Sequence, residues 1–145
     1  MTWCGGSSRN LGSVLQVLGE PAQARPCLER ALRIDEATYG PDHPDVARDV
    51  NNLGGVLQAL GDLEGARLAF ERALRIREAA FGVEHPAVAE SVWWLGTLME
   101  ALDDVDGARR CYERALQIFV KFLGSDHPRT VGVRNRLAAL KAKKG

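Results

Sequence analysis

The sequence predicts an all-α fold, an α-solenoid of antiparallel helix pairs closed by a C-terminal capping helix. Three observations predict it. The chain repeats every 42 residues, because His43, His85 and His127 share this spacing and residues 43–84 and 85–126 are identical at 19 of 42 positions. Apolar residues recur at steps of three and four, as on one helix face. Proline and glycine stand where helices would begin and end.

The 42-residue period divides a single predicted domain, residues 1–145, into three repeats and a closing segment. Residues 9–42 form the first repeat, with a truncated first helix, and residues 43–84 and 85–126 form the second and third. Residues 127–141 match the start of a repeat and predict a capping helix, since terminal repeats are atypical. Residues 1–8 do not fit the register, and this abrupt start suggests a segment of a longer solenoid.

The first helix of the middle repeat is expected from Pro44 to Leu60. Proline presets φ at the first helical position, where its missing N–H would be unpaired anyway. His43 directly before it is therefore the predicted N-cap. Gly61 is expected to end this helix.

The second helix is expected from Leu63 to Phe81, with Asp62 as its cap. Gly54 stands in the middle of the predicted first helix, although glycine in a helix interior costs about 1 kcal/mol relative to alanine. Glycine recurs at the same register position in the other repeats, at Gly12 and Gly96. We therefore expect a close approach of paired helices there, with the small residue Ala66 as the partner of Gly54.

Several of these residues resemble the signature of the tetratricopeptide repeat (TPR). They are Leu53, Gly54, Ala66, Phe70 and Ala73, with a Gly-Asp turn between the helices. The 42-residue period and the motifs HPDVA, NNLG and ERALRI resemble the longer-helix variant found in kinesin light chains and bacterial scaffold proteins. The resemblance covers residues 9–140 and implies a solenoid whose first helices line a concave groove.

In that family the groove binds extended peptides of partner proteins, and asparagines of the NN pair contact the peptide main chain. The resemblance carries this role to Asn51 and Asn52, and to Asn10 at the second position of the pair. Solvated polar residues are the alternative interpretation. Weaker candidates follow the same predicted helix face at steps of three or four residues: Arg48, Gln58, Glu90 and Gln16.

The third repeat departs from the pattern, because Trp93 and Trp94 replace both asparagines. Neighbouring side chains on a helix point about 100° apart. At least one indole is therefore expected to reach the groove, where aromatic residues serve as binding anchors. Alternatively, one indole packs between adjacent first helices and the other is a partly covered surface residue.

The end of the third repeat is more apolar than the preceding copy. Three apolar residues replace Arg77, Glu78 and Ala80, namely Phe119, Val120 and Phe122. We expect the closing helix to cover them with the side chains of Val131, Leu137, Ala138 and Leu140. The alternative is an interface with a second copy or a neighbouring domain.

Charge and composition argue against other classes of partner. Nineteen Lys and Arg balance nineteen Asp and Glu, so no basic excess favours nucleic acid. The apolar stretches fall far short of the roughly 20 residues of a membrane span, and the N-terminus lacks the pattern of a secretory signal. We therefore expect a cytoplasmic protein with neither a nucleic-acid nor a membrane partner.

The sequence also predicts no enzyme, cofactor or metal site. Three cysteines form an odd number without a C-x-x-C spacing, so buried or half-buried thiols are expected instead of disulfides. The histidines fall one to a repeat, a poor arrangement for sharing a zinc ion. Motifs for phosphate binding, zinc proteolysis or a nucleophilic serine are absent.

Together these observations predict a monomeric scaffold for protein–protein interaction. It would hold a partner segment in the groove through Trp93, Trp94 and the asparagine face. The alternative is a self-assembly module that stacks through its solenoid ends, as a fragment of a longer repeat protein.

Overall fold

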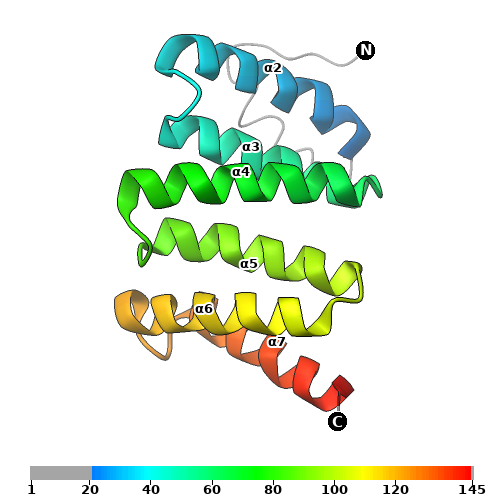
Figure 1. Cartoon of the computed structure of the whole chain (residues 1–145), viewed down its shortest axis with the longest axis vertical. Coiled ribbons are helices and arrows are strands. Elements are labelled where there is room, and N and C mark those ends of the chain that lie inside the picture. Colours follow the sequence, from blue (N-terminus) through cyan, green and yellow to red (C-terminus); the bar gives the residue numbers. More distant parts are fainter. Residues whose placement is uncertain (1–20, 145) are drawn as a thin grey trace. The chain divides into compact units, whose positions relative to one another are not determined.

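The structure is a computed structural model that describes residues 21–144, with side chains described for residues 22–142. Asn10, Gly12 and Gln16 lie outside the described residues. The described part contains helices and no strand, which confirms the predicted all-α fold (Figure 1). Its helices are α2 (Pro21–Tyr39), α3 (Pro44–Ala59), α4 (Leu63–Phe81), α5 (Pro86–Ala101), α6 (Val105–Leu123) and α7 (Pro128–Lys144).

The chain divides into two compact units, Met1–Ile76 and Arg77–Gly145. Within the first unit, α2 packs on α3, and apolar residues of α3 meet those of the first part of α4. Within the second unit, α6 packs on α5 on one side and on α7 on the other (Figure 1). The division into three repeats and a capping helix stays a prediction.

A histidine caps each helix that begins with proline after residue 40. Nδ1 of His43, His85 and His127 accepts a hydrogen bond from the backbone N–H two residues later, at 3.0, 3.0 and 3.1 Å. His43 and His85 also stack on the last aromatic residue of the preceding helix, Tyr39 and Phe81, with ring centroids 4.6 and 4.4 Å apart. The His-Pro pairs are therefore joints between helices, and the predicted cap at His43 is confirmed.

The other helix boundaries also follow the predicted signals. Gly40, Gly82 and Gly124 follow the second helices with φ of 93°, 90° and 87°, a left-handed conformation that glycine adopts without strain. Asp62 and Asp104 each accept a hydrogen bond from the N–H three residues later, at 3.0 and 2.9 Å. Local chemistry thus sets where each helix begins and ends.

The mid-helix glycines lie where paired helices approach closely, as predicted, but the partner is an aromatic ring. A Cβ on Gly54 would lie 2.7 Å from the ring of Phe70, and one on Gly96 would lie 2.7 Å from the ring of Tyr112. Both rings are fully buried. The nearest atoms are those of Phe70 and not of the expected partner Ala66, because the ring one helical turn further along α4 reaches the glycine first.

A repeated ion pair links consecutive second helices. Nη2 of Arg72 lies 2.7 Å from Oε2 of Glu36, and Nη2 of Arg114 lies 2.6 Å from Oε2 of Glu78. Each arginine also donates to a loop carbonyl oxygen, at 3.3 and 3.2 Å. The next position of the glutamate series is Val120, so this series of ion pairs ends at α6.

The buried face of α7 differs from the prediction by part of a turn. Leu137 and Leu140 are buried as expected, whereas Ala138 is exposed and Val131 is only partly buried. The other buried side chains of α7 are Thr130 and Val133. Spacings of three, four and three residues join the four buried positions, which is the stripe of a helix packed on one side.

The expectation of free thiols holds for one of the two described cysteines. Cys111 is a half-buried thiol, and burial raises its pKa above the ordinary value. Cys27 is buried and disulfide-bonded, which corrects the prediction. The odd number of cysteines does not prevent one pair from forming. Cys4 lies outside the described residues.

Replacing Gly96 with alanine is expected to destabilise the protein by about 1–3 kcal/mol, because the new methyl group overlaps the Tyr112 ring. Helix propensity alone would give the opposite sign, a gain of up to about 1 kcal/mol. Urea unfolding of the two proteins measures the difference.

Gly132→Ala is the matched control, since a Cβ on this α7 residue meets nothing within 4 Å. It is expected to leave stability unchanged or raise it by up to about 1 kcal/mol. Similar unfolding midpoints for the two variants would contradict the proposed role of the Gly96 contact.

Candidate functional site

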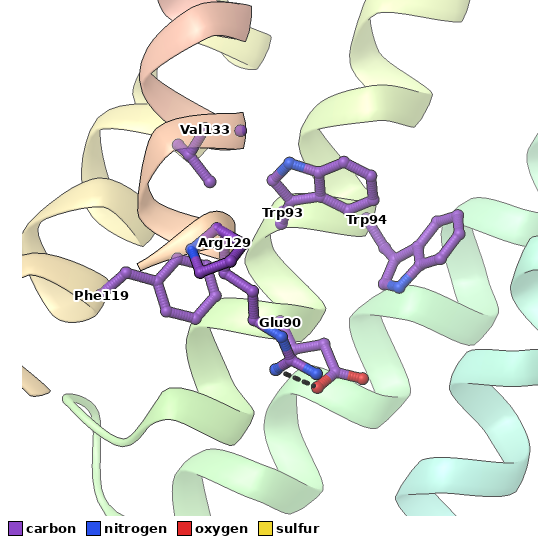
Figure 2. Close-up of a pocket in the computed structure, with 8 residues that line it drawn as sticks. Glu90, Trp93, Trp94, Phe119, Arg129 and Val133 are labelled. Carbon is purple, nitrogen blue, oxygen red and sulfur yellow. Dashed lines mark hydrogen bonds and ion pairs between the residues drawn. The ribbon is translucent and has the colours of Figure 1, made fainter. Parts of the chain in front are cut away.

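A pocket of about 410 Å³ opens between α5, α6 and α7 of the second unit (Figure 2). All three helices contribute side chains to its walls. Most of these side chains are apolar, and the charged ones come one each from α5 and α7. The lining residues are Glu90, Trp93, Trp94, Phe119, Pro128, Arg129, Gly132 and Val133.

Two tryptophans on consecutive positions of α5 form the largest aromatic surface of the pocket. The indoles of Trp93 and Trp94 are nearly perpendicular, at 85°, with ring centroids 5.0 Å apart. Both side chains are half-buried and both line the pocket, and Figure 2 shows them leaving α5 in different directions. An edge-to-face pair of this kind is a favourable aromatic arrangement.

Phe119 and Val133 contribute deeply buried pocket walls, with 2% and 1% of their surfaces exposed. The closing helix therefore covers Phe119, as expected. Val120 and Phe122 remain 41% and 50% exposed, so the expectation that α7 covers them is wrong. Val120 points about 100° away from Phe119 on α6, and Phe122 lies one residue before the helix ends.

An ion pair joins α5 to the first turn of α7 beside the aromatic walls. Nη1 of Arg129 lies 3.2 Å from Oε2 of Glu90 (Figure 2). Gly132, one turn further along α7, adds no side chain, and a Cβ there would meet no atom within 4 Å. In the 42-residue register this position corresponds to Glu90 and Arg48, whose long side chains would fill such a space.

A second polar contact holds α7 in place as a pocket wall. The Tyr112 hydroxyl donates to Oε1 of Glu100 at 2.6 Å, and Nε of Arg136 donates to the same oxygen at 2.8 Å. Burial and the Glu100 carboxylate raise the pKa of the Tyr112 hydroxyl well above its ordinary value. Side chains of α5, α6 and α7 thus meet at one carboxylate oxygen.

Comparison with known families identifies the repeats. A tetratricopeptide repeat family model matches residues 6–79, half of the chain, and a second tetratricopeptide repeat model matches residues 95–129. The chain belongs to the tetratricopeptide repeat family. No curated protein sequence shows significant similarity to this TPR chain.

Solved structures share the TPR fold and indicate its type. The chain is 26% identical to the nearly identical TPR-like repeats of a Podosopora anserina protein assigned as a kinesin light chain. The structural match covers 92% of this chain and 64% of the Podosopora anserina chain, with a TM-score of 0.83. The match indicates a TPR protein of kinesin-light-chain-like type, and the chain spans less than two thirds of that relative.

Two solved structures that are less than 25% identical to this chain support the fold alone. BtubC (BKLC) from P. vanneervenii is 23% identical, with 96% of this chain and 63% of that chain covered and a TM-score of 0.72. The apo form of RapI is 21% identical, with 94% and 48% covered and a TM-score of 0.80.

The pocket brings together four of the predicted site residues, Glu90, Trp93, Trp94 and Phe119. The other described groove candidates lie on α3, in the first unit. There Asn51 is only 3% exposed, whereas Asn52 and Gln58 are partly buried. Arg48 is exposed, and its Nη2 lies 3.6 Å from Oδ1 of Asp45. Their roles stay predictions, as does that of Asn10.

Sequence reasoning missed the α7 side of the pocket, which is formed by Pro128, Arg129, Gly132 and Val133. The 42-residue register contained a signal for one of them, because it aligns Gly132 with Glu90 and Arg48. No cluster of three His, Cys, Asp or Glu side chains suited to a metal ion occurs in the described part of the chain. Nor does any helix of that part combine the length and apolar character needed to cross a membrane.

The Tyr112 contact predicts a specific loss of stability at alkaline pH. From about pH 10 upward, an unfolded tyrosine loses its proton while the folded Tyr112 keeps it. The unfolded state then binds fewer protons, so stability falls with rising pH by up to about 1.4 kcal/mol per unit. Below about pH 9 the contribution of Tyr112 is fully present.

Tyr112→Phe removes this contribution, so the variant is expected to lose stability less steeply above pH 10 than the unmodified protein. Urea unfolding between about pH 8 and pH 11 measures both slopes, and the other titrating groups are common to the two proteins. Parallel pH profiles would contradict a buried, hydrogen-bonded hydroxyl at this position.

Proposed function

We propose that this TPR chain is a protein–protein interaction module that holds a segment of a partner protein in the pocket between α5, α6 and α7. The TPR family and fold support a scaffold role in protein–protein interaction in general. A TPR fold is typically non-catalytic, and the proposal assigns the chain no reaction or cofactor. The observation that carries it is the pocket formed around Trp93 and Trp94.

The size and walls of the pocket suit an anchoring side chain. Its volume of about 410 Å³ lies within the range of about 300–1,000 Å³ that is common for ligand sites. The walls combine half-buried indoles with buried Phe119 and Val133. Tryptophan is enriched among the few residues that dominate binding energy at protein interfaces. An inserted side chain would therefore bury its own surface together with two such residues.

The first unit supplies a second, polar candidate contact. Asn52 of α3 is partly buried, and Arg48 on the same helix is exposed. For the first unit by itself, we propose that these side chains hydrogen-bond the main chain of a partner segment bound on α3, with Asn10 and Gln58 as further candidates. Asn51 has 3% of its surface exposed and offers little to a ligand without local movement.

The alternative function, end-to-end stacking of copies, has mixed support. Exposed Val120 and Phe122 on α6 favour an interface there. Successive second helices, however, are joined by pairs such as Glu78 with Arg114, and α6 has Val120 where the next glutamate would stand. A further repeat of this type would lose that ion pair at α6, so we propose a monomer that acts through its pocket.

Selection of displayed random peptides on the immobilised protein tests the proposed site, with Gly132→Phe as the counter-selection variant. The phenylalanine enters the open space beside Gly132 and fills the pocket. Peptides selected on the unmodified protein are expected to lose at least about tenfold in affinity for Gly132→Phe, Trp93→Ala and Trp94→Ala, as is usual for interface anchors. Calorimetry measures the affinities.

Ala138→Phe is the matched control, because it adds the same ring to an exposed α7 position outside the pocket. This variant is expected to bind the selected peptides like the unmodified protein, and thermal unfolding verifies that every variant is folded. Peptides that bind Gly132→Phe as tightly as the unmodified protein would overturn the assignment of the pocket.

A further inference from the structure

We infer that the side chain which this pocket takes from its partner is a cation, arginine or lysine. This inference rests on the proposed function of the pocket and adds the chemistry of the ligand. Two indoles at 85° and the nearby Phe119 surround one space with aromatic rings. Aromatic faces carry negative potential and attract guanidinium and ammonium groups, most strongly when tryptophan supplies the ring.

A carboxylate stands beside these rings. Glu90 lines the pocket one helical turn before Trp93 and Trp94 on α5. Its side chain is 39% exposed, so an incoming group can reach it. A cationic side chain could therefore contact the indole faces and pair with Glu90 in one position. A carboxylate entering the same space would meet the negative potential of both the rings and Glu90.

Arg129 is the group that such a ligand must displace, and its position favours displacement. Its side chain is 56% exposed, and an ion pair between exposed side chains contributes little to stability. Arg129 also lies in the first turn of α7, where the helix dipole disfavours a cation. When a ligand cation takes over Glu90, the Arg129 guanidinium can turn into water.

The cation preference is specific to this repeat. In the 42-residue register, Arg48, Asn51 and Asn52 of α3 correspond to Glu90, Trp93 and Trp94 of α5. The second repeat therefore presents a cation and amides where the third presents a carboxylate and indoles. A ligand cation would be repelled at the α3 position and attracted at the α5 position.

A peptide panel read by NMR tests this inference on the full chain with Trp3→Phe, which leaves Trp93 and Trp94 as the two indole N–H signals. The probes are acetylated, amidated Gly-Ser-Xaa-Ser-Gly peptides in which Xaa is arginine, lysine, norleucine or glutamate. The arginine and lysine peptides are expected to bind about tenfold more tightly than the norleucine and glutamate peptides.

Two variants separate a cation site from an anion site. Glu90→Gln is expected to reduce the preference for arginine and lysine severalfold, because only the attraction of the aromatic faces is left. Arg129→Gln removes the competing guanidinium and is expected to strengthen the binding of the arginine and lysine peptides severalfold. Glu84→Gln is the matched control, since it breaks another exposed ion pair, with Lys121 at 2.6 Å, outside this pocket.

Tighter binding of the norleucine or glutamate peptide would overturn the cation inference while leaving the pocket as the proposed binding site. Loss of arginine-peptide binding in Arg129→Gln would overturn it in the same way. If no probe shifts either indole signal and the peptide selection also fails, both the inference and the proposed function are overturned.

Discussion

The close contact between a mid-helix glycine and a buried aromatic ring is the constraint on which the pairs α3–α4 and α5–α6 depend. At Gly96 the backbone of α5 lies so near the Tyr112 ring that even a methyl group would overlap it. This contact fixes α5 against α6, and hence the positions of Trp93 and Trp94 relative to Phe119. The Tyr112 hydroxyl then reaches Glu100, which also binds Arg136 of α7. One ring therefore positions helices on both sides of the pocket.

Positions that repeat every 42 residues build the fold, and positions that break the period form the candidate site. The histidine caps, the positive-φ glycines and the Arg–Glu pairs recur with nearly unchanged geometry. Trp93 and Trp94 break the period where asparagines stand in the preceding repeat, and Gly132 breaks it where Arg48 and Glu90 stand. Because α7 has a glycine at this position and α5 has two indoles in place of amides, the space between these helices is lined by aromatic rings with the Glu90 carboxylate beside them.

The sequence predicted helices well because their boundaries depend on local chemistry. The predicted limits of α4 match the structure, and α3 ends one residue earlier than predicted, since proline, glycine and Asp62 act within a few residues. Contacts between helices were harder to predict, because side-chain reach decides them. The atoms nearest to Gly54 belong to Phe70 and not to the expected Ala66. Of the α7 residues that line the pocket, only Gly132 had a signal in the sequence, its place in the 42-residue register. The α5 side of the site was predictable because the two tryptophans depart from an otherwise clear repeat.

Mapping of backbone amide shifts on titration with a selected peptide tests most directly whether the break in the period is the binding site. The largest shifts are expected on residues 90–94 of α5 and 129–133 of α7, with smaller shifts on the outer face of α6. Largest shifts around Val120 and Phe122, or on α2, would contradict it.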